Sequence, residues 1–342
     1  MKIAIIVNPL IPVPPQHYGG IERIVYMLIR ELLNFGHHVT LFAHPGSQPG
    51  CRLIGYNESK NYGTKDLLKI NLLTSKIAFG NFDLLHTFGR MDNIAALLLS
   101  KIPKVVSYQL PPTVGQVKKA VRIARKNSLY FTACSNYIAG QIKDYCDVTT
   151  IYNGVDVSEY IPRYEIGTSA PLVFLGRIQK EKGTAIAIEV ARQSGNKLII
   201  AGNVPDEPLH LQYFETEVKP YIDGGQITYI GPVNNTQKNE LLRNCKAFLM
   251  PVLWDEPFGI VMAEALACGA PIIGFRRGAV PEVVSDGENG FVCDNIEEMI
   301  NAVTKIGDIS REKCRKIVET TYSATVLAKQ YEQLYLRIVS KR

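Results

Sequence analysis

The stretch Leu172-Val173-Phe174-Leu175-Gly176 indicates the fold, because it restarts a pattern that already runs through the first half of the chain. It is a short apolar run that ends in glycine, and the amphipathic segment Thr184–Gln193 follows it. Apolar strands that alternate with amphipathic helices are typical of parallel sheets covered on both faces. The stretch therefore predicts a second α/β unit, and we place the boundary between the two units at residues 157 and 158.

The same alternation predicts the other elements of two doubly wound, Rossmann-like domains that face each other across a cleft. Each apolar run is 3 to 6 residues long, as is usual for strands. In the first half we predict strands at Lys2–Val7, Val39–Ala43, Leu84–His86, Val105–Tyr108 and Tyr130–Ala133 and a helix at Ile21–Phe35. In the second half we predict strands at Leu172–Gly176, Lys197–Ala201, Gln226–Ile230, Ala247–Met250 and Ala270–Gly274, and helices at Thr184–Gln193 and Ala324–Val339.

Length and composition are those of a globular protein with two domains. The chain has 342 residues, of which 46% are hydrophobic and 20% charged. No apolar run is long enough to span a bilayer, and the N-terminus shows no signal-peptide pattern. None of the seven cysteines forms a C-x-x-C pair, so neither a zinc site nor a disulfide framework is indicated. We therefore expect a cytoplasmic protein.

Basic residues are concentrated in the first half of the chain. Residues 1–157 carry 17 basic and 9 acidic side chains, whereas the remainder carries 21 and 23. A predicted amphipathic helix at Gln116–Lys126 presents five of the basic residues, Lys118, Lys119, Arg122, Arg125 and Lys126. This face would suit peripheral contact with the inner face of an anionic membrane, or it is simply solvated. No aromatic residues interleave with these charges, so nucleic acid is not an expected partner.

Two glycines stand immediately before the first predicted helix. Gly19 and Gly20 follow Tyr18, and paired glycines let a ligand approach the backbone where helix N–H groups are unpaired. A plain tight turn would explain them equally well.

A basic loop follows the first strand of the second half. Arg177 and Lys182 come after the carboxyl end of that strand, where open α/β sheets bind ligands. A planar guanidinium and a point charge together suit a diphosphate. An exposed loop without a ligand is the alternative.

Two glutamates mark the start of an unusually apolar helix. Glu256 should lie in the loop before a helix that starts near Phe258, and Glu264 about one and a half turns inside it. Carboxylates in such surroundings need partners, and hydroxyl groups beside a helix N-terminus would supply them. The alternative is one solvated and one ion-paired glutamate.

His86 is the strongest histidine candidate, since it ends a predicted strand and could point into the cleft. A lone histidine at such a position is more often structural than catalytic.

The order of these motifs resembles that of the retaining family 4, or group 1, glycosyltransferases, which have the GT-B fold. The resemblance covers the whole chain, and its most specific part is the E-x7-E pattern of Glu256 and Glu264. In that fold the last helix crosses back to the first domain. We therefore expect residues 323–342 to join residues 1–157, which would face the acceptor, and residues 158–322 to bind the nucleotide-sugar donor.

The resemblance implies catalytic roles for two basic residues and a glutamate. Arg177 and Lys182 would balance the charge of the departing diphosphate, as preorganised cations do. Glu256 would hold the donor sugar. Many family members have a histidine that contacts the donor sugar where this chain has Gln109, whose amide can hydrogen-bond but carries no charge.

The resemblance also implies a set of donor-binding residues. Glu264 would bind the ribose hydroxyls, and Val233 would meet the base, which we expect to be uracil. The remaining members would bind through their backbones: Gly19, Gly20, Phe258, Gly259 and Ile260.

The implied reaction is transfer of a sugar from a nucleotide diphosphate, most simply a UDP-sugar, to a hydroxyl of an envelope glycan or lipid-linked acceptor, such as lipopolysaccharide or capsule. No D-x-D motif occurs, so no metal or other cofactor is expected. Two alternatives stay open. One is a sugar-nucleotide-binding protein with weak catalysis, suggested by Gln109. The other is a sugar-nucleotide epimerase of similar fold, which would need acid and base residues beyond His86.

Overall fold

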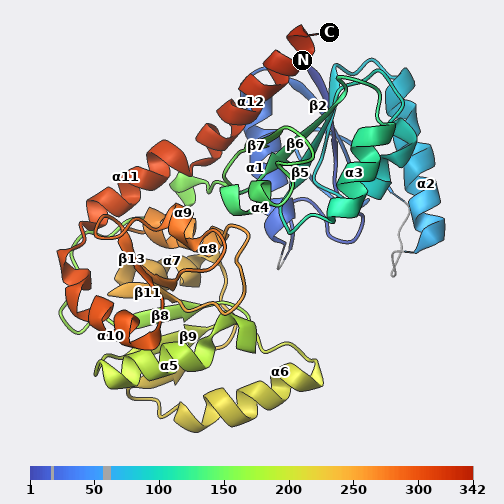
Figure 1. The fold of residues 1–342 in the computed structure, drawn as a ribbon. Helices are drawn as coiled ribbons and strands as arrows, with labels where there is room; N and C mark the ends of the chain where they lie inside the picture. The colour runs from blue at the N-terminus through green and yellow to red at the C-terminus, as the bar shows by residue number, and fades with distance from the viewer. Residues whose placement is uncertain (17–18, 57–62, 342) are drawn as a thin grey trace. The chain divides into compact units, whose positions relative to one another are not determined.

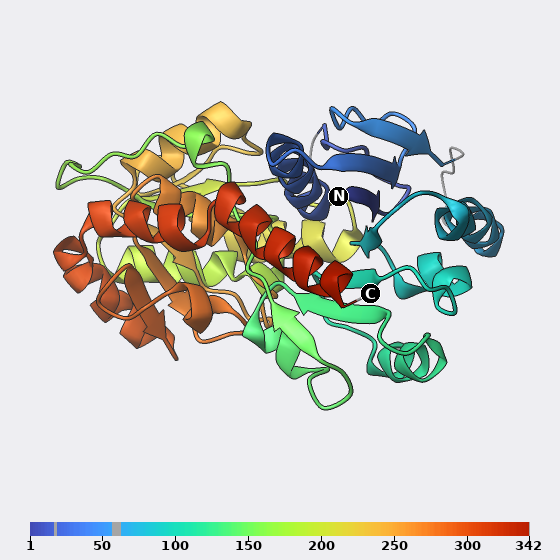
Figure 2. The same ribbon diagram turned by 90° about the horizontal axis from the view of Figure 1, so that it is seen from above.

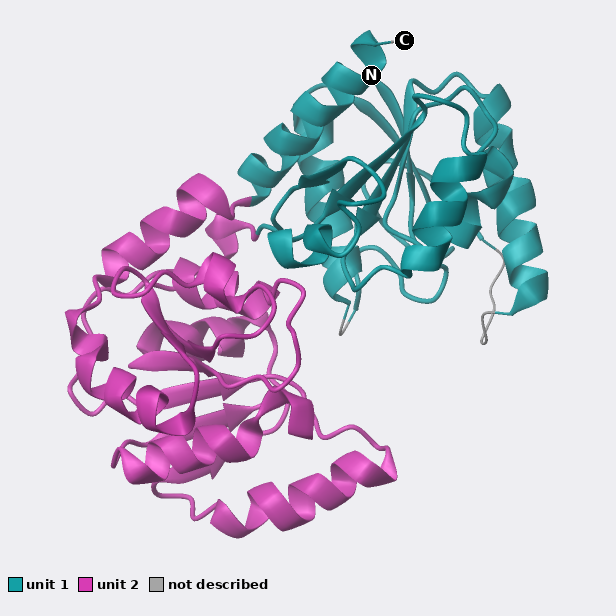
Figure 3. Ribbon diagram, viewed as in Figure 1, with its two compact units in different colours: residues 1–154, 324–342 teal, residues 155–323 magenta. Residues whose placement is uncertain are grey.

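A computed structural model describes residues 1–16, 19–56 and 63–341 of the chain (Figure 1). It divides into two compact units, unit 1 with residues 1–154 and 324–342 and unit 2 with residues 155–323 (Figure 3). Each unit is built on its own parallel sheet, as the sequence predicts. The boundaries predicted from the sequence lie after residue 157 and before residue 323.

Unit 1 contains a seven-stranded parallel sheet of order β3-β2-β1-β4-β5-β6-β7. Strand β1 is paired on both sides, with Ile5 opposite Leu41 of β2 and His86 of β4. The order reverses between β1 and β4, which makes their carboxyl ends a topological switch point. The strands are β1 (Lys2–Ile6), β2 (His38–Ala43), β3 (Arg52–Gly55), β4 (Leu84–Thr87), β5 (Lys104–Tyr108), β6 (Leu129–Ala133) and β7 (Val148–Thr150).

Helices cover both faces of this sheet. One apolar core joins the sheet to α2, α3 and the 3₁₀ segments η1 and η2, through residues such as Ile70, Ile94 and Val117. On the other face α1 packs against α12, and Figure 1 shows the two termini at the same end of unit 1. The helical segments are α1 (Gly20–Asn34), α2 (Thr64–Ser75), η1 (Lys76–Phe79), η2 (Met91–Leu97), α3 (Val114–Ile123), α4 (Asn136–Gly140) and α12 (Ala324–Ser340).

Unit 2 contains a six-stranded parallel sheet of order β10-β9-β8-β11-β12-β13. Its order reverses between β8 and β11, so the loops that follow these two strands border the switch point. The strands are β8 (Leu172–Leu175), β9 (Leu198–Ala201), β10 (Ile227–Tyr229), β11 (Ala247–Met250), β12 (Ile272–Phe275) and β13 (Gly290–Cys293).

The helices of unit 2 follow the strands in alternation. α8 packs against α11 and α7, while α5 and α10 contact each other. The helical segments are η3 (Val157–Glu159), η4 (Lys180–Lys182), α5 (Thr184–Gln193), α6 (Pro208–Tyr213), η5 (Phe214–Val218), η6 (Lys219–Tyr221), α7 (Asn235–Asn244), α8 (Ile260–Ala267), α9 (Val280–Val283), α10 (Ile296–Lys305), η7 (Ile306–Asp308) and α11 (Arg311–Thr321).

Three strands, β3, β7 and β13, were not predicted from the sequence. All three lie at sheet edges, where one side has no neighbouring strand and the apolar signal is weak. The predicted end of the basic helix was also too late. α3 ends at Ile123 because the N–H of Arg125 donates to the carbonyl of Leu98 (2.9 Å), which takes the chain away from the helix axis.

Candidate active site

The switch point of unit 2 gathers the predicted charged residues. The loop after β8 carries Arg177 and Lys182, and the loop after β11 carries Glu256. Since β8 and β11 are neighbours in a parallel sheet, both loops leave from the same edge. The structure thus brings together residues that are far apart in the sequence.

Lys182, Trp254 and Glu256 form the centre of this arrangement. Lys182 Nζ lies 2.9 Å from Glu256 Oε2, and the indole N–H of Trp254 donates to the same oxygen at 3.0 Å. The Lys182 ammonium also lies 4.5 Å from the centre of the Trp254 ring, a cation–π contact. Within the described part of the chain no hydrogen-bond partner contacts the other carboxylate oxygen, Oε1. That oxygen can accept a hydrogen bond from a ligand hydroxyl.

Trp254 joins the candidate site through its contacts with Glu256 and Lys182 and was not singled out in the sequence. It is the single tryptophan of the chain, and it stands two residues before Glu256. Its position in the loop after β11 was the available signal, since indole is a donor that can hold a carboxylate.

Tight backbone contacts hold these loops in place. Gly183 has φ 77°, and a Cβ there would lie 1.9 Å from the carbonyl oxygen of Pro251. Gly278, with φ 55°, would place a Cβ 2.3 Å from the carbonyl oxygen of Glu256, which accepts from the N–H of Ala279 at 2.8 Å. Only glycine permits these close contacts, which fix the position of the backbone around Glu256.

The N-terminus of α8 adjoins this centre. The helix begins at Ile260 rather than near Phe258, and Gly259 is its N-cap, with no side-chain cap. The first N–H groups of a helix have no partners within it, and the helix dipole adds positive character there. Phe258 is buried against the ring of Tyr322, so its contribution to a ligand would come from its backbone.

Glu264 lies inside α8 and is buried. Its Oε1 lies 2.7 Å from Lys238 Nζ of α7 and accepts a hydrogen bond from the Tyr160 hydroxyl at 2.8 Å. Both glutamates of the pair are therefore ion-paired, whereas the sequence allowed one to be solvated. Lys238 and Tyr160 had no local signal, because they come from distant parts of the chain.

Two further predicted residues lie at the same edge of the sheet. Arg177 follows β8 and is exposed. Val233 follows β10, which lies two strands away from β8, and it is half-buried. The carboxyl edge of unit 2 thus carries a charged centre and, further along, an apolar side chain.

The paired glycines lie at the switch point of unit 1. Gly19 is the N-cap of α1 and Gly20 its first residue, at the end of the loop that follows β1. A Cβ on Gly19 would lie 2.7 Å from Cβ of Pro15, so the loop closes tightly there. Tyr18 lies outside the described residues.

Gln109 follows β5 and pairs with Asn153. Its Oε1 accepts from Asn153 Nδ2 at 2.7 Å. Gln109 Nε2 and Asn153 Oδ1 are buried and have no hydrogen-bond partner within the described residues. Buried polar atoms are nearly always partnered, so this donor and acceptor fit a polar ligand. Asn153 was not singled out in the sequence.

The prediction that His86 points into a cleft is wrong. His86 is completely buried; its Nδ1 lies 2.5 Å from the Tyr335 hydroxyl and its Nε2 lies 2.6 Å from Ser107 Oγ. Burial lowers its pKa to about 3, so the ring is neutral. Its register on β4 turns the side chain toward α12, which gives it a structural role.

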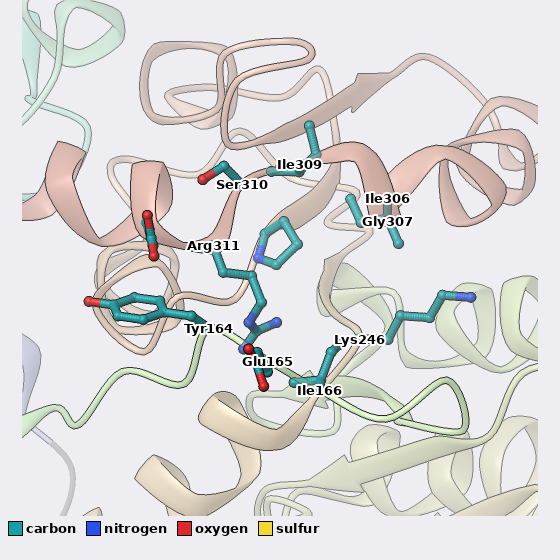
Figure 4. Close-up of a pocket in the computed structure, with 11 residues that line it drawn as sticks. Tyr164, Glu165, Ile166, Lys246, Ile306, Gly307, Ile309, Ser310 and Arg311 are labelled. Carbon is teal, nitrogen blue, oxygen red and sulfur yellow. The ribbon is translucent and has the colours of Figure 1, made fainter.

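A pocket in unit 2 lies away from these residues. It has a volume of about 480 Å³ and is lined by residues that include Lys246, Pro271 and Arg311 (Figure 4). Lys246 and Pro271 precede β11 and β12, so the pocket is at the amino ends of the strands. The Arg311 guanidinium already donates to three backbone carbonyls, of Arg163, Arg243 and Cys245. This pocket is a gap between structural elements and not the predicted donor site.

The described residues show neither a cluster of metal ligands nor a helix that could span a membrane. No group of three or more potential metal ligands is found among them. None of the described helices combines the length and the apolar character needed to cross a bilayer. The expected absence of a metal stays a prediction.

Known protein families match both units. Residues 158–324 match the family described as "Glycosyl transferases group 1", and residues 18–159 match "Glycosyltransferase Family 4". With its two Rossmann-like units, the chain therefore belongs to the group 1, or family 4, glycosyltransferases, which have the GT-B fold.

Similar sequences include two from Bacillus. The chain is 25% identical over 244 residues to N-acetyl-alpha-D-glucosaminyl L-malate synthase of Bacillus anthracis, covering 64% of this chain and 62% of that one. It is 24% identical to spore coat protein SA of Bacillus subtilis (strain 168), covering 93% and 92%.

Solved structures share the fold. AviGT4, a glycosyltransferase involved in avilamycin A biosynthesis, has a TM-score of 0.75 at 23% identity over 100% of this chain and 98% of its own. Sucrose-phosphate synthase from Thermosynechococcus elongatus has a TM-score of 0.80 at 18% identity and covers 100% of both chains. Anabaena HepE, solved with UDP and glucose, has a TM-score of 0.74 at 17% identity over 98% and 99%.

Proposed function

We propose that the protein is a retaining glycosyltransferase that moves a sugar from a UDP-sugar to a hydroxyl of an envelope glycan or glycolipid. The observation that carries the proposal is the Lys182–Glu256 contact of 2.9 Å at the switch point of unit 2. It places a cation and a carboxylate with one oxygen available beside the N-terminus of α8. A diphosphate and a sugar hydroxyl are the complementary groups.

The residues divide the work of the proposed reaction. Lys182 and Arg177 would balance the negative charge that develops on the leaving diphosphate, and the N–H groups at the start of α8 would hold its oxygens. Glu256 Oε1 would accept a hydrogen bond from the donor sugar. No general base is assigned, because the leaving phosphate can take the acceptor proton on the same face of the sugar. That geometry would retain the anomeric configuration.

The donor and the acceptor are supported to different degrees. A protein of the same fold, Anabaena HepE, was solved with UDP and glucose, which supports a UDP-sugar. Another, the WaaB structure, is described as a lipopolysaccharide outer core galactosyltransferase, which supports an envelope acceptor. A cytoplasmic location, and membrane contact by the exposed basic side chains of α3 and the two basic residues that follow it, belong to the same proposal.

A matched pair of lysine variants tests the proposal. Lys180 and Lys182 occupy the same short turn, η4. Of these two lysines, Lys182 is the one that contacts Glu256. We expect Lys182→Ala to lower kcat/KM for sugar transfer by at least about 100-fold, or about 3 kcal/mol, because a preorganised cation is lost. Lys180→Ala should stay within about twofold. Equal rates in both variants would contradict the proposed role.

A thermal-shift screen against nucleotide sugars would identify the donor. A ligand present at 100 times its Kd stabilises the folded state by about 2.7 kcal/mol, so the true donor should give the largest shift. NMR of the anomeric proton in the product would then establish whether the configuration is retained.

A sugar-nucleotide-binding protein with weak catalysis is the second candidate, and Gln109 is the observation that favours it. It predicts a thermal shift with UDP but no transfer with any acceptor. Slow but measurable hydrolysis of a UDP-sugar would argue against it. The epimerase alternative loses support, since its proton carrier was to be His86, and that ring is buried and neutral.

A further inference from the structure

The outer surface of α2 and the segments beside it exposes large apolar side chains. Four stand out by the exposed fraction of each residue, Leu68 (71%), Leu72 (71%), Phe79 (93%) and Leu99 (70%). Single exposed leucines are ordinary on protein surfaces, but a group of them marks an interaction site.

The spacing along α2 places lysines among these apolar residues. Positions three and four apart lie on the same face of a helix. The exposed residues of α2 and the start of η1 follow this spacing: Lys65, Leu68, Lys69, Leu72 and Lys76. The opposite face of α2 buries Ile70 in the core of unit 1. The outer face therefore combines positive charge with exposed apolar groups.

A pocket of about 450 Å³ continues this surface toward the end of α3. It is lined by apolar side chains that include Phe79, Phe82 and Leu99, with Lys101 and Arg125 also lining it. Figure 2 shows α2, η2 and α3 in a row along one side of the unit 1 sheet. Both basic residues are exposed, so the pocket is an apolar hollow beside positive charges.

The acidic residues near this surface already have partners. Asp66 accepts from the N–H of Gly63 at the start of α2 (3.1 Å), and Asp92 lies 3.3 Å from Arg90. The sequence has no acidic residue between Asp92 and Asp144. Among the described residues of this surface, basic side chains therefore outnumber acidic ones, and its net charge is positive.

We propose that this surface, defined by Lys65, Leu68, Lys69, Leu72, Lys76, Phe79, Leu99 and Lys101, docks on an anionic lipid bilayer. The lysines would face the negative head groups, and the apolar side chains would enter the boundary between head groups and acyl chains. A second copy of the chain would set like charges against each other. Nucleic acid offers no apolar phase for four large side chains.

The docking surface differs from the basic helix that the sequence indicated. The exposed apolar residues of α3, Val121 and Ile123, are only 40% and 38% exposed. The helix α3 would therefore contribute basic charge to docking, and its apolar side chains would insert little into the bilayer. Docking goes beyond the proposed sugar transfer. It rests on that function only in that a bilayer would present a lipid-linked acceptor.

Vesicle co-sedimentation tests the proposal with the full chain. The wild type should sediment with vesicles of phosphatidylcholine and phosphatidylglycerol, less so at high salt, and not with phosphatidylcholine alone. Leu68→Ser/Leu72→Ser/Phe79→Ser should weaken this binding by at least about tenfold. Lys65→Gln/Lys69→Gln/Lys76→Gln should weaken it by a similar factor or more. The matched control is Leu209→Ser/Leu211→Ser on α6 of unit 2, which should bind as the wild type does.

Several results would overturn docking. They are equal binding to neutral and anionic vesicles, unchanged binding of both triple variants, and a concentration-dependent dimer that the serine variant abolishes. A thermal shift with UDP that matches the wild type would show that each variant is folded, and the single change Phe79→Ser serves if the triple variant is not. Sugar transfer to a soluble acceptor is measured separately, so loss of docking and loss of the proposed function are distinguishable.

Discussion

The two sheets of this protein use their polar residues in opposite ways. In unit 1, His86, Ser107 and Thr132 lie on neighbouring strands, and the tyrosines of α12 cover them. In unit 2, Lys182 and Glu256 lie in loops beyond the strand ends and keep partial exposure, with side chains 20% and 11% accessible. A polar residue near the end of a strand is therefore no guide to a site by itself. What matters is whether it stands within the strand, under a helix, or past its end.

Glu264 gives the largest expected effect, because it combines both situations. It is buried like His86, but it lies within α8, the helix that follows the loop of Glu256. Replacing it by alanine leaves the ammonium of Lys238 buried without its carboxylate, so we expect a loss of about 3–5 kcal/mol in unfolding free energy. Denaturant unfolding measures this loss.

Glu264→Gln separates structure from donor binding at this position. It keeps an acceptor for Tyr160 and the shape of the side chain, so its stability should lie between those of the alanine variant and the wild type. If the glutamine variant is stable but shows no thermal shift with UDP-sugars, the carboxylate binds the donor. If Glu264→Ala were as stable as the wild type, the buried pair of Lys238 and Glu264 would contribute nothing to the unfolding free energy.

Glu256→Gln should affect chemistry and leave stability nearly intact. We expect kcat/KM to fall by about 10²–10³, or about 3–4 kcal/mol. The unfolding free energy should change by only about 1 kcal/mol, because glutamine keeps an oxygen acceptor and the ammonium of Lys182, whose side chain is 20% accessible, stays in contact with water. Steady-state kinetics and thermal unfolding give the two quantities. Glu181→Gln, an exposed change in η4, is the control and should alter neither.

His86, in contrast to Glu256, should affect stability and not activity, and it should make the stability depend on pH. Burial lowers its pKa to about 3 in the folded state, whereas an unfolded histidine titrates near 6.5. The unfolded state therefore binds a proton first, and stability is full above about pH 6.5 and falls as the pH drops toward 3. At pH 5 the loss should be about 2 kcal/mol.

Comparison with His86→Gln isolates the contribution of His86 to the pH dependence of the unfolding free energy. The difference in unfolding free energy between wild type and variant should narrow between pH 7.5 and pH 5, and transfer activity per folded molecule should be equal. A parallel pH dependence of the two proteins would mean that His86 is not the titrating group.

Trp254→Phe should give the smallest effect. The ring over Lys182 remains, but the hydrogen bond to Glu256 is lost, so kcat/KM should fall by about fivefold, or about 1 kcal/mol. Trp254→Leu removes the ring as well and should cost more. Since Trp254 is the one tryptophan of the chain, its emission in the wild type should change when a nucleotide sugar binds. An unchanged rate in both variants would remove Trp254 from the site.

Most strands and several helices could be predicted from sequence, because apolar runs and amphipathic periods are local. α5 (Thr184–Gln193) and β11 (Ala247–Met250) have the predicted bounds. Three of the edge strands, β3, β7 and β13, and the helices α2, α7, α10 and α11 were not predicted, because their apolar signal is weaker or interrupted by polar residues. α2 is the clearest case, since its exposed leucines obscure the buried face.

The charged candidates were found as motifs, but the contacts that they make were not. Lys182 lies 74 positions from Glu256, and Tyr160 lies 104 positions from Glu264. Trp254 and Asn153 became candidates only because the structure shows their hydrogen bonds to Glu256 and Gln109. The roles of all these residues in binding and catalysis remain predictions.

By itself, the sequence determined the α/β class, the two-unit order and the family, since each depends on short patterns and their succession along the chain. The tertiary structure decided which polar side chains are accessible and which are joined. His86 and Glu256 both stand near the ends of strands in the sequence. His86 is buried under α12, whereas Glu256 lies in a loop, where it contacts Trp254 and Lys182. The reason is physical: strand order brings distant loops to one edge, and register sets the face on which each side chain emerges.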